Sequence, residues 1–358
     1  MILRFNLDKI LGMLDRDLLD PDWIHPDGIL HLEKWRTFNH EVFRINEVAM
    51  AAGLGSARTY FSFIDRTGAT PSLVKTYVPD EHRIPKGKPQ SFNFLDLCMS
   101  RAQQLLDTGK HITVLWSGGL DSTLLLFALI RQAKHIDQLS VLCTFESILE
   151  SGGLFDAVIK NLGIRVKVDQ TRNNCNLPFS YDHEDHEQIY VTGQCADQLF
   201  VSRLFKLPEV DPLEHWHNVY HPHIIDLVEP SIKFSERPIE TVEDFRWWMT
   251  FNYSFTTTLY DSCVERPPHV CKRIISFYAT PEFQRWAIHA PVYRDDEYRL
   301  PAKQALSQLV DYPYYIQHKR KGFSATWRAN RRWYALDKNF KTHYTDVHVY
   351  RSYTPSNT

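Results

Sequence analysis

One short stretch of the chain combines glycines, hydroxyls and a carboxylate in a spacing that suits phosphate chemistry. It runs Ser117-Gly-Gly-Leu-Asp-Ser122, directly after the apolar run Ile112 to Trp116 and before a second apolar run, Leu124 to Ile130. This pattern predicts a buried strand, a tight turn and the start of a helix near Ser122. Free backbone N–H groups at such a helix start, together with the helix dipole, favour a bound anion.

The side chains of this turn indicate a polyphosphate with a divalent cation. Gly118 and Gly119 lack a Cβ atom, so a phosphate can approach the main chain closely. Ser117 and Ser122 add hydroxyl donors. Asp121 is compatible with a bound phosphate if a divalent cation lies between the two negative groups. The Walker A pattern and the dinucleotide-binding glycine pattern are both missing from the sequence.

The six residues of this turn resemble the SGGxDS loop of the ATP pyrophosphatase (PP-loop) family, which cleaves ATP to AMP and pyrophosphate. A second turn, Thr192-Gly-Gln-Cys-Ala-Asp-Gln-Leu-Phe200, is similar to the GEGADELF loop of the asparagine synthetase family, whose synthetase domain also carries SGGxDS. The resemblance implies that Asp121 and Asp197 hold a magnesium ion that bridges the phosphates, with Gly193 in the nucleotide site. A helix N-cap is the other interpretation of Asp197.

The second turn also departs from the family pattern. Gln194 and Gln198 stand where the family has glutamates, and Cys195 replaces a glycine. Because Gln194 cannot exchange a proton as a carboxylate does, the conversion of aspartate to asparagine is not carried over. A small buried residue is the favoured interpretation of Cys195, and a nucleophilic thiol is the alternative.

The resemblance resumes near the C-terminus. The matching segments are Phe277 to Trp286, Arg299 to Leu306, and Ile316 to Phe323. Arg299 takes the place of a family lysine, and Lys303 that of a family arginine. The catalytic family lysine falls on Arg320 or Lys321, depending on the register, and we assign it to Lys321. A cation there would neutralise the charge that builds as pyrophosphate departs. A surface basic run is the alternative.

From Phe92 onward, apolar strands alternate with helical patterns. The expected strands are Ile112 to Trp116, Leu139 to Phe145, Ile164 to Val168 and Ile189 to Val191. The expected helices are Leu95 to Leu106, Ser122 to Ala133, Gly153 to Leu162, Thr241 to Thr258 and Lys272 to His289. The alternation predicts an α/β fold with a parallel sheet, whose ligand sits beyond the carboxyl ends of the strands. Thr144 and Phe145 are then expected beside an adenosine.

The resemblance implies a doubly wound, PP-loop/HUP-like sheet with a helical C-terminal substrate region. We expect a small N-terminal α+β domain of unknown role over 1–91, ending in a proline-rich linker. The synthetase domain would span 92–340, and a polar tail 341–358. The net charge is −2, the six cysteines form no Cys-x-x-Cys pair, and no apolar run could span a bilayer. These features favour a reduced, cytoplasmic protein without membrane contact. These features do not indicate which oligomeric state the protein adopts.

These motifs predict a stand-alone, AMP-forming ligase that uses ATP and Mg²⁺ to join a small-molecule acid to an amine. The glutaminase domain of asparagine synthetases depends on an N-terminal cysteine, whereas Met1 is followed here by Ile2. One alternative is a PP-loop enzyme that modifies a nucleic-acid base. The mixture of basic and aromatic residues over 318–334 favours it, and the balanced net charge opposes it. Another is a non-catalytic nucleotide-binding protein, suggested by Gln194 and Gln198.

Overall fold

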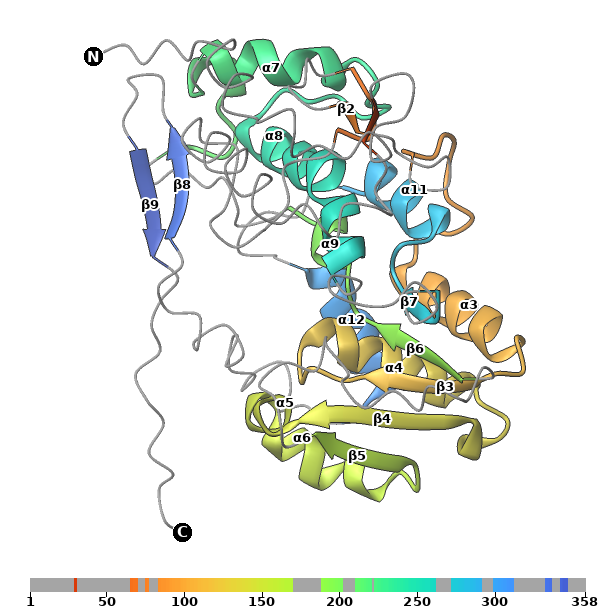
Figure 1. Cartoon of the computed structure of the whole chain (residues 1–358). Helices are drawn as coiled ribbons and strands as arrows, with labels where there is room; N and C mark the ends of the chain where they lie inside the picture. The colour runs from red at the N-terminus through yellow and green to blue at the C-terminus, as the bar shows by residue number, and fades with distance from the viewer. Residues whose placement is uncertain are drawn as a thin grey trace, which may run out of the picture.

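The fold contains a five-stranded parallel sheet, which lies in the lower half of the view in Figure 1. The computed structural model describes residues 29–30, 65–69, 75–76, 83–169, 188–201, 210–220, 222–261, 272–291, 299–311, 332–336 and 342–346. The strands are β3 (His111–Leu115), β4 (Leu139–Thr144), β5 (Arg165–Asp169), β6 (Gln188–Thr192) and β7 (Ile274–Ser276). They lie in the order β5-β4-β3-β6-β7, and every neighbouring pair is parallel. The protein therefore has an α/β fold.

The order of the strands reverses on the two sides of β3. The register places Val114 of β3 opposite Val141 of β4 on one side and Val191 of β6 on the other. The chain runs outward from β3 to β4 and β5, and later from β6 to β7. Ligands of α/β sheets bind at the carboxyl ends of the strands where such a reversal occurs. Both acidic turns leave the sheet from this edge, one after β3 and the other after β6.

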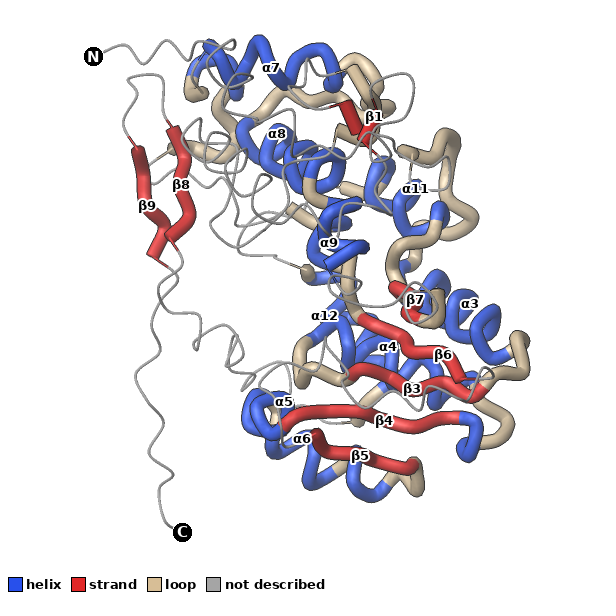
Figure 2. Tube along the Cα trace, viewed as in Figure 1, coloured by secondary structure: helices blue, strands red, loops and turns tan. Residues whose placement is uncertain are grey.

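Helices lie against the sheet (Figure 2). The apolar side chains of its central strands are buried. Helices α3 (Phe94–Leu106), α4 (Leu120–Gln132) and α12 (Leu300–Leu309) pack against one another, while the short helices α5 (Phe145–Glu150) and α6 (Gly152–Ala157) follow β4. Alternation along β3 separates two clusters, as expected of a strand. Ile112 and Val114 belong to the large core with α3 and α4, whereas Leu115 packs with Leu142 and Tyr190.

A helical region lies beyond the carboxyl edge of β6 (Figure 1). It contains α7 (Pro222–Ile232), α8 (Val242–Trp248), a π-helical segment (Met249–Tyr253), α9 (Phe255–Asp261) and α11 (Pro281–His289). Single 3₁₀ turns span Ile136–Gln138, Ile159–Asn161, Asp197–Leu199 and Trp216–Asn218. Two further strand pairs are the parallel β1 (Ile29–Leu30) with β2 (Lys75–Thr76), and the antiparallel β8 (Arg332–Leu336) with β9 (Thr342–Asp346).

The segment 65–69 is anchored in the helical region through Arg66. This side chain is 2% exposed, and its guanidinium donates to the carbonyl oxygen of Phe251 at 3.0 Å. The guanidinium also lies over the ring of Phe255, 4.2 Å from the centroid. Burial lowers the pKa of Arg66 to about 9. Arg66 therefore ties the segment 65–69 to the π-helical stretch Met249–Tyr253.

The predicted elements of the sheet and its first helices are confirmed to within about two residues. Three differences stand out. Phe145 begins α5 instead of ending a strand, and the helix expected over 153–162 is divided into α6 and a 3₁₀ turn. The helix expected from Lys272 is wrong at its start, because Ile274–Ser276 pairs with β6 as an edge strand. No helix in the described ranges has the length and apolar character needed to cross a membrane.

Candidate functional site

The turn after β3 is closed by hydrogen bonds between its own residues. The backbone N–H of Ser117 donates to Oγ of Ser122 at 3.0 Å, and the two serine hydroxyl oxygens lie 2.9 Å apart. The N–H of Gly119 donates to Oγ of Ser117 at 3.2 Å. Gly119 is the N-cap of α4 and provides no side-chain cap for the first helical N–H groups. These groups can therefore bind an anion.

Gly118 is the position at which this turn requires glycine. Its φ is +74°, a left-handed conformation, and a Cβ added there would overlap the carbonyl oxygen of Ser147. Oγ of Ser151 donates to the carbonyl oxygen of Gly118 at 2.7 Å. The turn is thus packed against α5 and against Ser151, which follows α5.

The turn after β6 packs directly on the first turn. A Cβ on Gly193 would come within 2.9 Å of the backbone nitrogen of Ser122 and 3.1 Å of Cβ of Asp121. Glycine at 193 therefore lets the two turns approach each other closely. The hydroxyl of Tyr278 donates to the carbonyl oxygen of Asp121 at 3.0 Å, which ties the first turn to the chain after β7.

Cys195 occupies a backbone conformation that suits glycine. Its φ is +65°, and its side chain is 1% exposed. Burial raises the pKa of the thiol to about 12, so the reactive thiolate is suppressed at neutral pH. The prediction that Cys195 is a small buried residue is confirmed, and its burial and raised pKa weigh against the alternative of a nucleophile.

The two glutamines of the second turn have different surroundings. Gln198 is 6% exposed, and its Nε2 donates to Oγ1 of Thr258 at 3.0 Å, so its side chain faces α9. Gln194 is partly exposed, and its backbone carbonyl accepts a hydrogen bond of 2.7 Å from Oγ of Ser276. Asp197 is the first residue of its 3₁₀ turn, whose N-cap is Ala196, so the N-cap interpretation of Asp197 is wrong.

The carboxylates of Asp121 and Asp197 converge on one guanidinium, that of Arg299. Nη1 of Arg299 donates to both oxygens of Asp121, at 3.0 and 2.8 Å, and its Nη2 contacts Oδ1 of Asp197. The side chain of Arg299 is 8% exposed, against 19% for Asp121 and 60% for Asp197. The three groups carry a formal charge of −1. The arrangement gathers two carboxylates and a cation where the strand order reverses.

Most of the predicted nucleotide-site residues meet at this edge. They are Ser117, Gly118, Gly119, Asp121, Ser122, Gly193 and Asp197. Thr144 ends β4, is 2% exposed, and caps α5 by accepting a bond from the N–H of Ser147. The side chain of Phe145 and the whole of Arg320 and Lys321 lie outside the described residues.

The sequence prediction missed two site residues. The resemblance places Arg299 at a family lysine and predicts no partner for it, although a cation directly before a helix start is electrostatically unfavourable. Glu150 is 7% exposed, and its Oε1 lies 3.9 Å from where a Cβ of Gly119 would stand. Glu150 ends the short helix α5, and no motif in the sequence indicates that this residue lies near the first turn.

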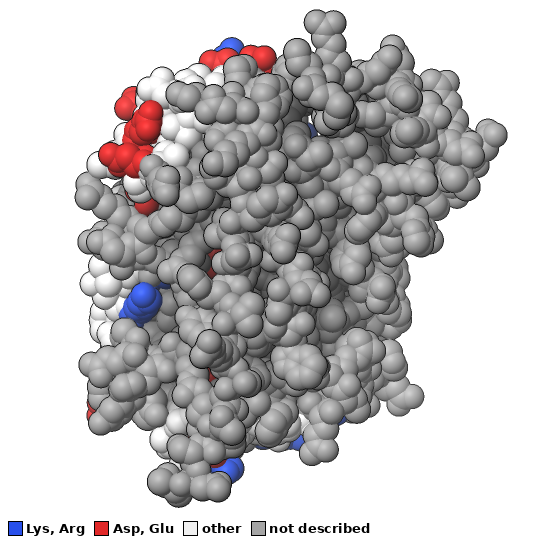
Figure 3. All heavy atoms as spheres, turned by 90° about the vertical axis from the view of Figure 1, so that its left-hand side faces the viewer, with Lys and Arg blue, Asp and Glu red and all other residues white. Residues whose placement is uncertain are grey.

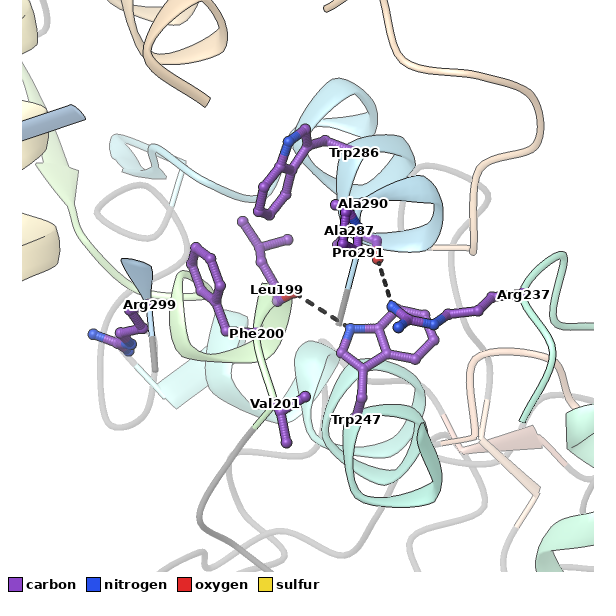
Figure 4. Close-up of a pocket in the computed structure, with 10 residues that line it drawn as sticks. All are labelled: Leu199, Phe200, Val201, Arg237, Trp247, Trp286, Ala287, Ala290, Pro291 and Arg299. Carbon is purple, nitrogen blue, oxygen red and sulfur yellow. Dashed lines mark hydrogen bonds between the residues drawn. The ribbon is translucent and has the colours of Figure 1, made fainter. Parts of the chain in front are cut away.

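A cavity beside Arg299 is too small for a substrate. It has a volume of about 10 Å³, enough for one water molecule at most. Figure 4 shows Arg299 at one end of it, with the guanidinium directed away from the rings of Trp247 and Trp286. Leu199 and Phe200 lie between them, so the apolar side of the second turn separates Arg299 from Trp247 and Trp286.

Two further features of the described side chains are the grouping of possible metal ligands and the distribution of charge on the surface. Among the described side chains, no three His, Cys, Asp or Glu residues are grouped so that they could hold a metal ion. On the face shown in Figure 3, the described acidic side chains gather toward the end that carries α7, and the described basic ones are scattered.

No protein-family model matches the chain, and no curated protein matches it significantly.

Proposed function

We propose that the protein is an ATP-dependent, AMP-forming ligase with a PP-loop/HUP-like core, similar to the synthetase domain of asparagine synthetases without a glutaminase domain. The observation that carries the proposal is the meeting of Asp121 and Asp197 beside the glycine turn, at the edge where the strand order reverses. Two carboxylates that reach one cation suit Mg²⁺, which proteins usually hold with one or two carboxylates and the phosphates of the substrate. Bound Mg²⁺ would neutralise charge on the phosphates.

The residues of the first turn bind the polyphosphate. Gly118 and Gly119 allow the phosphates to approach the main chain, and the first N–H groups of α4 donate to them. Ser117 and Ser122 exchange their mutual hydrogen bond of 2.9 Å for bonds to phosphate oxygens. Thr144 and the backbone of Phe145 border the nucleoside from the end of β4.

The chemistry has two steps. An oxygen of a carboxylate or amide substrate attacks the α-phosphorus of ATP, and the bond to the departing pyrophosphate breaks. The nitrogen of an amine then attacks the activated carbon, AMP leaves, and the amine loses a proton. Lys321, or Arg320 in the other register, neutralises the negative charge that both steps build.

Pyrophosphate release from ATP tests the proposal. The protein is incubated with ATP, Mg²⁺ and panels of small acids and amines, and wild type is compared with Asp121→Asn. The matched control is Asp137→Asn, which removes an exposed carboxylate from the 3₁₀ turn before β4. We expect the Asp121 variant to lose release by at least about 100-fold and the control to match wild type. Equal release from all three proteins would contradict the mechanism.

A non-catalytic nucleotide-binding protein is the second candidate. It is favoured by Arg299, because a guanidinium already neutralises the two carboxylates that the ligase needs for its metal. Calorimetry of ATP binding, together with the assay of pyrophosphate release, distinguishes the ligase from the non-catalytic binding protein. ATP binding without pyrophosphate release under every substrate mixture would support the second candidate over the ligase.

A further inference from the structure

Arg299 lies where the proposed function needs a metal ion. Its guanidinium contacts both oxygens of Asp121 and one oxygen of Asp197, so both proposed metal ligands are already paired with a cation. A magnesium ion must approach a carboxylate oxygen to about 2.1 Å. A magnesium ion and the guanidinium therefore compete for these oxygens, because two positive groups at such short range repel each other.

The position of Arg299 is fixed by its helix. Its backbone is left-handed, with φ 58° and ψ 28°, and its carbonyl accepts the first helical bond of α12 from the N–H of Lys303 at 3.0 Å. Ala302 and Leu306 are buried, and α12 packs on α4, the helix that begins at the glycine turn. The base of Arg299 is therefore held beside the turn, whereas its long side chain can change rotamer.

The two carboxylates differ in how tightly they are enclosed. The side chain of Asp121 is 19% exposed and shares two hydrogen bonds with Arg299, while that of Asp197 is 60% exposed. Asp197 therefore gives solvent and ligands a route to the cluster. A metal–nucleotide complex can reach the carboxylates from this side, and its phosphates offer the guanidinium new acceptors.

We propose that Arg299 is an exchangeable internal counter-ion: it holds Asp121 and Asp197 together in the nucleotide-free protein and transfers to the phosphates when a metal–nucleotide complex binds. This role rests on the proposed nucleotide site and makes Arg299 a positioning residue. Its consequence is coupling between ligands. A divalent cation alone competes with Arg299 and binds weakly, whereas the nucleotide draws the guanidinium away and makes the cation bind more tightly.

Binding of Mn²⁺ alone, followed by electron paramagnetic resonance of the free ion, tests this directly. The variants are Arg299→Gln and, as the matched control, Arg131→Gln, which removes an exposed arginine from the last turn of α4. We expect Mn²⁺ to bind the Arg299→Gln protein at least tenfold more tightly than wild type, and the control to bind within twofold of wild type. A non-hydrolysable ATP analogue should tighten Mn²⁺ binding to wild type and have much less effect on Arg299→Gln.

Several results would overturn the proposal. One is Arg299→Gln binding Mn²⁺ no more tightly than wild type, and another is no Mn²⁺ binding by either protein. If thermal melts show that Arg299→Gln does not fold, Arg299→Lys replaces it, because a lysine keeps the charge but reaches fewer carboxylate oxygens at once. About threefold tighter Mn²⁺ binding is then expected, and unchanged binding overturns the proposal. Tighter Mn²⁺ binding without any pyrophosphate release from wild type would instead reject the ligase and retain the role of Arg299.

Discussion

The turn from Ser117 to Ser122 has a network of hydrogen bonds among its own residues in addition to outside bonds from Ser151 and Tyr278, whereas the side-chain bonds described for the turn from Gly193 to Phe200 go to residues outside it. In the first turn, two serine hydroxyls bond to each other and to the backbone. In the second, the chain is held through bonds from Ser276 and to Thr258, in β7 and α9. The first turn is thus preorganised for an anion, and the second depends on the packing of the helical region.

Backbone strain separates the two turns as well. Gly118 takes its left-handed conformation without a steric cost, because it has no Cβ. Cys195 adopts nearly the same φ with a side chain, which costs about 1–2 kcal/mol. Its thiol lies in a buried environment beside the carbonyl oxygen of Phe255. The burial of the side chain offsets the strain of the backbone.

Replacing Gly118 should have the largest effect. In Gly118→Ala the new Cβ would overlap the carbonyl oxygen of Ser147, so we expect the free energy of unfolding to fall by at least about 3 kcal/mol. Gly163→Ala is the matched control, because Gly163 has φ +71° but open space around its Cα. This control should lose only about 1 kcal/mol. Urea unfolding measures both, and equal losses would contradict a steric requirement at Gly118.

The next largest effect is expected at Asp121, and substitution of Asp197 should destabilise the protein less. Asp121→Asn leaves a nearly buried guanidinium without its bidentate partner, so we expect a loss of about 2 kcal/mol in the free energy of unfolding. Asp197→Asn should cost less than about 1 kcal/mol, because that side chain is 60% exposed and water screens its charge. Both variants should lose ATP affinity by similar factors in calorimetry. A loss of affinity in only one of them would show that the carboxylates do not act on one cation.

The smallest effect is expected at Cys195. In Cys195→Gly, the relief of backbone strain and the loss of a buried thiol nearly cancel, so the free energy of unfolding should change by less than about 1 kcal/mol. Cys143→Gly is the comparison, since Cys143 is fully buried in β4 without a left-handed backbone. There we expect a loss of about 2 kcal/mol. Equal losses in thermal melts would show that the conformation of Cys195 carries no strain.

Much of the sheet could be predicted from the sequence, because its strands are continuous apolar runs between glycines and polar residues. β3 and β6 were found from such runs to within one or two residues. β7 was not predicted, because Ile274–Ser276 is short and is followed directly by further apolar residues, so the sequence gives no sign of where the strand ends. The irregular segment Met249–Tyr253 lay inside a predicted helix, because periodicity does not distinguish a π-helical turn from an α-helical one.

The site could be predicted only in part. The residues of the two turns can be recognised from their types and spacing. The parallel order of the strands then places Asp121 and Asp197 at the same carboxyl edge of the sheet. The contact with Arg299 could not be foreseen in this way, because it depends on a left-handed backbone at Arg299 and on how α12 packs against α4. Such packing is long-range and has no local pattern in the sequence.

The order of the strands also sets a sequence of events during synthesis of the chain. The ribosome completes β3, β4 and β5 in turn before it reaches β6, which begins at Gln188. Until then, β3 presents an open edge of unpaired backbone groups, which is prone to pair with other chains. Because the second turn arrives with β6, a nucleotide that needs both turns can stabilise only chains that have closed this edge.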